Sequence, residues 1–413
     1  MTGARKPMLS RREALDFLLA ACRPLAEVET VPTLEANGRV LGADCVSGLD
    51  VPAQDNTQMD GYAVRAADFA SSAETPVPAL PRVFRISQRI PAGHVGEPLQ
   101  AGTAARIFTG AFIPEGADAV VMQEQCEAHG DTVTIHHAPR AGEWVRRAGE
   151  DIRSGNVILP AGTRLRSQEL GLAASIGLAS LPLLRRARVA VFFTGDELTM
   201  PGEPLAPGGI YNSNRFALRA LLENLGCDVT DLGIVPDSLD ATRAVLRQAA
   251  ACSDLIITSG GVSVGEEDHV KPAVEAEGKL AMWQIAIKPG KPLAFGEVGN
   301  AFFIGLPGNP VSSFVTFLLF VRPFLLKLQG ARDAAREPLA FPLRADFDWK
   351  GDRRNEFLRA RINAQGGLDL FPNQGSGVLT STVWGDGLID NPPDRPIAAG
   401  DTVRFIPFTE LLY

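Results

Sequence analysis

Three segments carry the polar residues that are best suited to binding anions and metal ions. They are residues 194–198, 258–268 and 306–312, and each follows a short apolar run of strand type. Glycines in them let backbone N–H groups approach an anion, and hydroxyl, amide and carboxylate groups add donors or metal ligands. Turns with solvated acids have the same composition, so one segment alone leaves both interpretations open.

The segment 258–268 is the most suggestive of the three. Gly260 and Gly261 allow close approach of an anion, and Ser259 and Ser263 add hydroxyl donors. Asp268 follows as a candidate metal ligand or base. A glycine turn between a strand and a helix is the alternative, with about even odds for this segment alone.

The segment 306–312 contains Pro307, Gly308, Asn309 and Pro310 directly before a hydrophobic stretch. This rigid turn predicts a helix N-terminus with unpaired N–H groups and Ser312 in its first turn, which suits an anion. Simple turn chemistry, with Asn309 as the helix cap, is the favoured alternative for this motif alone.

Two lysines stand on a stiff loop within the strand-like run 285–295. Pro289 and Pro292 restrict the backbone around Lys288 and Lys291. Two cations on a rigid loop suit a tetrahedral oxyanion or a phosphate. An isolated lysine would instead be a solvated surface residue.

The elements that must position these segments follow from hydrophobic periodicity. Ser10 and Glu13 predict a capping box that opens a helix ending near Ala21. Strands alternate with helices after residue 188, which predicts a parallel, three-layer α/β domain. The carboxyl ends of its strands lie at one edge, where ligands bind. The expected strands are 189–193, 228–234 and 254–258, and the expected helices are 214–225, with Asn214 as cap, and 239–250.

The whole chain is expected to be a multidomain protein of α/β plus β class. An extended N-terminal domain comprises residues 1–50 and 140–183, and a small β-rich domain, 51–139, is inserted into it. The three-layer α/β domain comprises 184–330 and a C-terminal β domain comprises 331–413. In the last domain, the alternating arginines of 353–361 are interpreted as a solvated strand face.

Composition excludes several classes of protein. The 413 residues carry a net charge of −8, which argues against nucleic-acid or anionic-membrane binding. The five cysteines form no CxxC pair, so a zinc site or disulfide framework is not expected. No secretory signal is visible, and the apolar run 314–321, which ends at Arg322-Pro323, is too short for a membrane span. A cytoplasmic protein is expected.

Eight motifs in this order resemble the molybdopterin molybdenumtransferase family, which also includes the C-terminal domain of gephyrin. The similarity covers nearly the whole chain, and eight motifs in family order are highly specific. The motifs are Asp-Asn-Thr-Gln-Met-Asp-Gly-Tyr-Ala (55–63), Arg-Ile-Phe-Thr-Gly-Ala (106–111), Gly-Glu-Asp-Ile (149–152), Thr-Gly-Asp-Glu-Leu (194–198), the segment 258–268, Lys-Pro-Gly-Lys-Pro (288–292), Leu-Pro-Gly-Asn-Pro-Val-Ser (306–312) and Gln-Gly-Ser-Gly (374–377).

The resemblance implies the reaction and the assembly. Members of the family insert molybdate into adenylylated molybdopterin in a magnesium-dependent reaction that releases AMP and gives molybdenum cofactor. The α/β domain would bind molybdopterin, and an elongated homodimer would place the active cleft at its interface. Partners would be a molybdopterin adenylyltransferase and molybdoenzyme-maturation proteins.

The resemblance also implies residue roles. Molybdate would be held by Lys288, Lys291, Ser312, Arg354 and Ser376, with Lys288 also catalytic. The pterin phosphate and nucleotide would lie on the loops with Ser259, Gly260, Gly261 and Ser263, and with Pro307, Gly308, Asn309 and Pro310. The acids Glu197, Asp237 and Asp268 would be catalytic and bind Mg²⁺, and Asp60, Thr109 and Asp151 would be catalytic residues from the other domains.

Three residues depart from the family pattern, namely Phe193, His269 and Gln284. They bear on substrate affinity and fine geometry rather than on the class of reaction. Three alternatives remain open. An adenylyltransferase would use a similar α/β domain but would not need residues 1–183 and 331–413. A receptor-anchoring scaffold has this architecture in gephyrin. Tungstate is a near isostere of molybdate.

Overall fold

The computed structural model describes residues 8–70, 80–262 and 269–412. The chain forms two compact units, which are treated separately below. The first unit contains Met1–Ala43, Ala161–Ser167 and Ser180–Tyr413, and the second contains Asp44–Pro160 and Gln168–Ala179.

The first unit begins with helix α1 (Arg11–Ala21), and the predicted capping box is confirmed. The Glu13 amide donates to the Ser10 hydroxyl at 3.3 Å, and the Ser10 amide donates to the Glu13 carboxylate at 2.8 Å. This reciprocal pair satisfies N–H groups that the first turn cannot pair itself. Ala14, Leu18 and Leu19 form the buried face of α1.

A six-stranded sheet forms the centre of the α/β domain in the order β16-β13-β17-β21-β20-β18. Its first four strands are parallel, as the sequence predicts, but β20 runs antiparallel to both of its neighbours, so the sheet is mixed. The short connection between β20 and β21 explains the difference, because a hairpin can join only antiparallel strands. The strands are β13 (Arg188–Thr194), β16 (Asp228–Val235), β17 (Leu255–Ser259), β18 (Gly278–Gln284), β20 (Pro292–Val298) and β21 (Ala301–Leu306).

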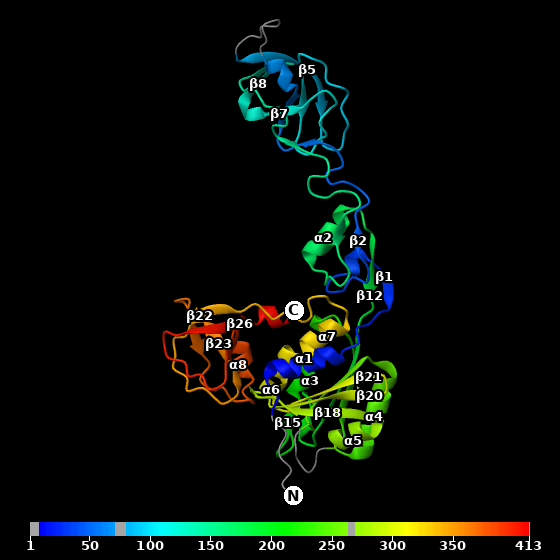
Figure 1. The fold of residues 1–413 in the computed structure, drawn as a ribbon, viewed down its shortest axis with the longest axis vertical. Helices are drawn as coiled ribbons and strands as arrows, with labels where there is room; N and C mark the ends of the chain where they lie inside the picture. The colour runs from blue at the N-terminus through cyan, green and yellow to red at the C-terminus, as the bar shows by residue number, and fades with distance from the viewer. Residues whose placement is uncertain (1–7, 71–79, 263–268, 413) are drawn as a thin grey trace. The chain divides into compact units, whose positions relative to one another are not determined.

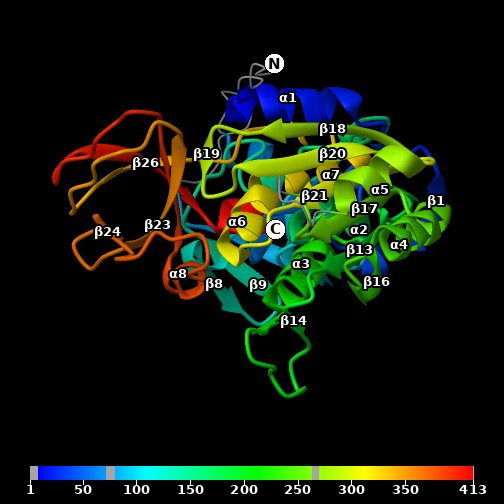
Figure 2. The same cartoon turned by 90° about the horizontal axis from the view of Figure 1, so that it is seen from below.

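Helices cover both faces of this sheet, which confirms the three layers (Figures 1 and 2). Strand β13 shows the alternation, because Val189 and Val191 face one hydrophobic cluster while Ala190 and Phe192 face the other. The first cluster packs against α1, α3 (Ser213–Asn224), α6 (Pro310–Thr316), η4 (Phe317–Val321) and α7 (Arg322–Leu328), and the second packs against α4 (Leu239–Cys252) and α5 (Val270–Glu277).

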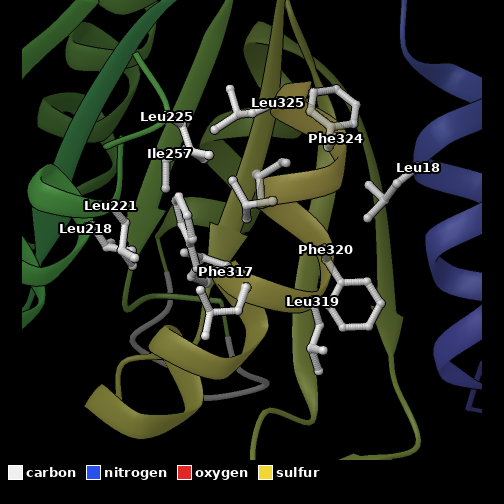
Figure 3. Close-up of a cluster of buried hydrophobic side chains, with 14 of the residues drawn as sticks. Leu18, Leu218, Leu221, Leu225, Ile257, Phe317, Leu319, Phe320, Phe324 and Leu325 are labelled. Atoms are coloured by element: carbon white, nitrogen blue, oxygen red, sulfur yellow. The ribbon is translucent and has the colours of Figure 1, made fainter. Parts of the chain in front are cut away.

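The first cluster is the main hydrophobic core. In Figure 3, Phe320 and Phe324 lie on the side of their helix that faces Leu18 of α1, in agreement with the contacts of α1 with η4 and α7. Phe320 and Phe324 are fully buried, and removing a ring of this kind typically costs about 3–5 kcal/mol.

The apolar run after Asn309 extends further than the sequence predicts. Residues Pro310–Leu328 form one helical stretch, in which the π-helical turn η4 directly precedes Arg322 and Pro323. Proline lacks an N–H and clashes with the carbonyl four residues before it, and a wider turn accommodates both. This stretch is long and apolar enough to cross a membrane, but 83% of its most apolar window is buried inside the protein. It is therefore a core helix.

Helix α3 also differs from its prediction at one residue. Its cap is Asn212, whose side chain accepts a hydrogen bond from the Arg215 amide, rather than Asn214. The predicted helix itself is confirmed, and Leu218, Leu221 and Leu222 form its buried face.

A second sheet forms the C-terminal part of the first unit, in the order β19-β23-β25-β26-β22, with β24 paired to β23. Its first strand comes from the α/β part of the chain, because Ile287 pairs with Asn355 and Lys288 with Glu356. The prediction of a solvated arginine face on 353–361 is wrong at Arg359, which is 0% exposed. The elements are β19 (Ile287–Lys288), β22 (Phe341–Arg344), β23 (Asn355–Ile362), β24 (Leu368–Leu370), α8 (Thr380–Trp384), β25 (Gly387–Asn391), β26 (Thr402–Pro407) and α9 (Thr409–Leu412).

Short elements complete the first unit. Strand β1 (Val28–Pro32) pairs antiparallel with β12 (Ser180–Leu184), and β14 (Leu198–Thr199) pairs parallel with β15 (Ile210–Tyr211). A 3₁₀ turn, η1 (Thr33–Glu35), follows β1.

The second unit contains a six-stranded sheet in the order β7-β4-β6-β5-β9-β8. Its small apolar side chains, such as Ala63, Ala104 and Ala105, are buried on both faces. The elements of the unit are β2 (Cys45–Val46), β3 (Asn56–Thr57), β4 (Gly61–Val64), η2 (Ala66–Phe69), β5 (Arg82–Ile90), β6 (Thr103–Ile107), β7 (Ala119–Met122), η3 (Gln123–Gln125), β8 (Cys126–His129), β9 (Thr132–Ile135), β10 (Val145–Arg146), β11 (Val157–Leu159) and α2 (Ser167–Ser175).

Candidate functional site

One cavity of the first unit collects most of the residues that the sequence selects. Strands β13, β17 and β21 are adjacent and parallel, so the loops after them meet at the same edge of the sheet. The cavity there has a volume of about 750 Å³. The predicted site residues that line it are Glu197, Asp237, Ser259, Gly260, Gly261, Lys288, Lys291, Pro307, Gly308, Asn309, Pro310, Ser312, Arg354 and Ser376.

Backbone geometry explains why glycine stands at the turn after β17. Gly260 has a φ of +99°, and a Cβ built on it would lie 2.8 Å from the Thr194 carbonyl oxygen. Its amide donates to the Leu306 carbonyl at 3.1 Å. The turn is thus wedged between the loops of the neighbouring strands, and any side chain would force them apart.

Asn214 joins these loops and is a site residue that sequence reasoning missed. Its amide nitrogen donates to the Ser259 hydroxyl at 2.8 Å and to the Gly308 carbonyl at 2.7 Å. The Ser259 hydroxyl in turn donates to the Pro307 carbonyl at 2.9 Å. In the sequence, Asn214 is an asparagine near the start of a predicted helix. That position fits a helix cap as well as it fits a residue that joins two loops.

Lys288 lies between two carboxylates at the wall that the C-terminal sheet forms. Its ammonium nitrogen is 3.1 Å from Asp352 and 3.2 Å from Glu356. Glu356 is fully buried and also accepts a hydrogen bond from the Trp349 indole at 2.7 Å. Partial burial would lower the pKa of Lys288, but hydrogen bonds from it to the two carboxylates raise that pKa above its ordinary value. Lys288 is therefore charged and fixed in position.

Asp352 connects Lys288 with a second cation of the same wall. Arg354 donates to Asp352 through its backbone amide at 3.1 Å and through Nε at 3.2 Å. Partial burial opposes ionisation of Asp352, but the hydrogen bonds from Arg354 and Lys288 hold its pKa well below the usual range. Lys291, by contrast, forms no ion pair with any residue that the structure describes.

The loop with Ser376 completes this wall. The Ser376 carbonyl accepts a hydrogen bond from the Val311 amide at 2.9 Å, which ties the loop to the first turn of α6. Ser312 lies in that same turn and lines the cavity. The two serines predicted to hold an oxyanion thus come from segments that are bonded to each other.

Carboxylates suited to a metal ion lie on the α/β side of the cavity. Glu197 and Asp237 both line it, whereas Asp268 and Ser263 lie outside the described residues. No group of three or more His, Cys, Asp or Glu side chains suited to a metal occurs within the described ranges. Magnesium is commonly held by one or two carboxylates together with water and substrate phosphates, so the two acids present fit such a site.

The second unit holds the remaining predicted residues. Thr109 donates to the Asp60 carboxylate through its amide at 2.8 Å and its hydroxyl at 2.7 Å. These two bonds lower the pKa of Asp60. The Asp151 amide donates to the Val51 carbonyl at 3.0 Å, and no hydrogen bond within the described chain joins Asp151 to the other two.

The three residues that depart from the family pattern have ordinary structural positions. Phe193 is buried in the main core, His269 stands at the N-cap position of α5, and Gln284 ends β18 opposite Pro292. None of the three is among the residues that line the cavity.

Comparison with known proteins places this geometry in a family. Three family models match successive parts of the chain: the MoeA N-terminal region (domain I and II) over residues 9–177, a probable molybdopterin binding domain over 190–327, and the MoeA C-terminal region (domain IV) over 342–408. A molybdopterin molybdenumtransferase of Haemophilus influenzae is 40% identical to the chain, over 98% of this chain and 100% of that protein. The chain belongs to the molybdopterin molybdenumtransferase family. It is thus a transferase of molybdenum-cofactor biosynthesis, as its motifs indicate.

Further relatives agree with this family. A molybdopterin molybdenumtransferase 2 of Mycobacterium tuberculosis is 38% identical over 94% of this chain and 96% of that protein. Among solved structures, a molybdopterin biosynthesis MoeA protein from Pyrococcus horikoshii OT3 superposes with a TM-score of 0.82, at 29% identity, over 97% of this chain and all of that one. The match includes residues on both sides of the α/β domain, which argues against the adenylyltransferase alternative.

Proposed function

We propose that this transferase inserts molybdate into adenylylated molybdopterin, releasing AMP and giving molybdenum cofactor in a magnesium-dependent reaction. One observation carries the proposal. Three cations and the serines Ser312 and Ser376 line the same cavity as two carboxylates and a glycine turn. A tetrahedral dianion and a phosphoanhydride need these two sets of groups side by side.

The C-terminal wall supports the binding of molybdate. Lys288, Lys291 and Arg354 supply positive charge, while Ser312 and Ser376 supply hydroxyl donors. Because Asp352 and Glu356 fix Lys288, its ammonium group needs little reorganisation when the oxyanion enters.

The α/β wall supports the binding of the adenylylated pterin. A cavity of about 750 Å³ falls in the range of small-molecule sites, which is roughly 300–1,000 Å³. The glycine turn after β17, where the backbone can approach a ligand closely, is suited to phosphate groups. Glu197 and Asp237, with Asp268, would hold Mg²⁺, which neutralises phosphate charge when bound.

The assembly and setting belong to the same proposal. We propose a cytoplasmic homodimer in which the partner's second unit supplies Asp60, Thr109 and Asp151. The hydrogen bonds from Thr109 keep Asp60 ionised and oriented, as a residue acting on a bound cationic or hydroxyl group requires. A molybdopterin adenylyltransferase and molybdoenzyme-maturation proteins would deliver the substrate and receive the product.

AMP release from adenylylated molybdopterin tests the proposal. The purified full chain is incubated with Mg²⁺, with and without molybdate, and formation of active cofactor is measured in parallel. Molybdate-dependent AMP release is expected, with a loss of roughly a hundredfold or more in Lys288→Ala and Asp268→Ala. Lys271→Ala serves as the matched control because Lys271 is an exposed lysine on α5. Absence of release by the unmodified chain, where a known transferase is active, would reject the proposed reaction.

A further inference from the structure

A fully buried arginine lies directly behind the wall that carries Ser376. Arg359 belongs to β23 and is 0% exposed. Its guanidinium donates to the Ser381 hydroxyl at 3.1 Å, the Phe357 carbonyl at 3.2 Å and the Gly375 carbonyl at 3.2 Å. All three acceptors are neutral, and no carboxylate pairs with Arg359 in the described part of the chain.

A buried charge of this kind is costly unless something compensates for it. Moving a charged group out of water costs several kcal/mol. Folded proteins normally offset this cost by placing a partner of opposite charge beside the buried group. Burial alone lowers the pKa of Arg359 to about 10, which still leaves the guanidinium charged at neutral pH. The fold therefore retains a positive charge in this place without neutralising it.

The acceptors of Arg359 connect this charge to the cavity. Gln374, Gly375 and Ser376 all line the cavity, and Gly375 is the residue whose carbonyl the guanidinium holds. The Gln374 side chain also accepts from the Arg359 amide at 2.9 Å and donates to the Arg359 carbonyl at 3.0 Å. The guanidinium is thus one residue removed from the proposed oxyanion ligand Ser376.

The other cations of this wall are largely neutralised by the protein itself. Asp352 and Glu356 both contact Lys288, and Asp352 also binds Arg354. These four groups sum to zero charge, so they distinguish weakly between a monoanion and a dianion. Among the cations that line the cavity, Lys291 has no carboxylate partner in the described ranges. Arg359, behind the wall, has none either, and it is a cation that water does not screen.

We infer that Arg359 determines the charge selectivity of the oxyanion site, favouring tetrahedral dianions over tetrahedral monoanions. This inference rests on the proposed function, since it concerns the same oxyanion. Arg359 acts through the loop 374–377 and is a positioning and specificity residue rather than a catalytic one. In a low-dielectric interior, its positive charge attracts each negative charge of the bound anion. A dianion therefore gains about twice the electrostatic stabilisation of a monoanion.

Equilibrium dialysis of the full chain against molybdate and perrhenate tests the inference. The two ions are tetrahedral and similar in size, but perrhenate carries one negative charge and molybdate two. Metal analysis of both compartments gives both dissociation constants. We expect the preference of the unmodified chain for molybdate to fall roughly tenfold in Arg359→Gln and to change less than about twofold in Arg359→Lys. Arg361→Gln is the matched control, because Arg361 is exposed two residues further along β23.

A second variant keeps the test decisive if Arg359→Gln does not fold. Ser381→Asp places a carboxylate against the guanidinium, at a position whose hydroxyl now lies 3.1 Å from Arg359 Nε. It cancels the charge without removing the side chain and should reduce the preference as Arg359→Gln does. Equal loss of affinity for both ions, with an unchanged preference in both variants, would show a purely structural role and overturn the inference.

The same experiment distinguishes failure of the proposed oxyanion site from failure of the role inferred for Arg359. If the unmodified chain binds neither ion, the oxyanion site itself is wrong, and the inference falls with it. If it binds molybdate while every variant keeps the same preference, the oxyanion site stands and only the role of Arg359 is rejected.

Discussion

The two walls of the cavity are held together by different kinds of interaction. The α/β wall is joined by neutral hydrogen bonds, in which Asn214, Ser259 and Gly308 take part, and by glycine turns with no room for a side chain. The C-terminal wall is joined by charges, with Lys288 and Arg354 sharing Asp352. A neutral network is insensitive to salt and pH, whereas a charged one responds to both. The proposed function assigns the adenylylated pterin to the neutral network and the oxyanion to the charged one.

Replacing Glu356 should destabilise the C-terminal wall and cause the largest loss of stability. Glu356 is buried and accepts hydrogen bonds from Lys288 and from the Trp349 indole. Glu356→Ala therefore leaves Lys288 with Asp352 alone and leaves the buried indole N–H without its acceptor. We expect the free energy of unfolding to fall by roughly 3 kcal/mol, as measured by urea denaturation. Glu356→Gln can still accept from Trp349 and should lose less. Equal stability of all three proteins would show that the wall does not depend on this charge.

Adding a side chain at Gly260 should destabilise the α/β wall, with a somewhat smaller loss of stability. Gly260→Ala puts a Cβ 2.8 Å from the Thr194 carbonyl in a left-handed conformation, with an expected loss of about 2 kcal/mol. Gly38→Ala is the control, because Gly38 has a φ of +76° but no atom within 4 Å of the added Cβ. Thermal unfolding should therefore separate the two variants, and matching melting temperatures would contradict the close approach.

Truncating Asn214 should loosen the neutral wall without unfolding the domain. Asn214→Ala removes two hydrogen bonds that join the loops after β17 and β21, worth about 1–2 kcal/mol together. We expect kcat/KM for the adenylylated pterin to fall roughly tenfold while the dissociation constant of molybdate changes less than about twofold. A loss confined to molybdate would instead place Asn214 functionally with the other wall.

The ionisation of Asp352 should have the smallest effect on stability, and this effect depends on pH. Its folded pKa lies below the usual value of about 3.9, so it contributes stability above that pH and loses it as the pH falls through the folded pKa. The stability of the unmodified chain should thus decrease more steeply below about pH 4 than that of Asp352→Asn. Parallel curves in acid urea denaturation would show that this carboxylate gains nothing from its partners.

The sequence predicts the α/β wall well because the wall follows from local rules. Strand periodicity and the edge rule for parallel strands bring the three loops together without any knowledge of packing. The role of Asn214 was not predicted, because an asparagine at the start of a helix can either cap the helix or join two loops by hydrogen bonds. The actual cap, Asn212, lies two residues earlier.

The C-terminal wall was less predictable because its groups meet across long sequence distances. The motifs select Lys288 and Arg354, but nothing local shows that residues near 350 neutralise them. Arg359 shows the same limit, since alternation along β23 predicts an exposed side chain and the covering loop 374–377 reverses that expectation. Pro323 similarly marks a helix end in local terms, and only the core explains why the helix continues.

The pairing of β19 with β23 has a consequence for how the protein matures on the ribosome. Lys288 emerges about seventy residues before Glu356, so the nascent α/β domain first exposes its lysine loop with no strand beside it. The proposed oxyanion site is completed only by residues of the last part of the chain, such as Arg354 and Ser376. A polypeptide that ends before Asn355 therefore lacks the strand beside Lys288 and the carboxylates that fix its ammonium group.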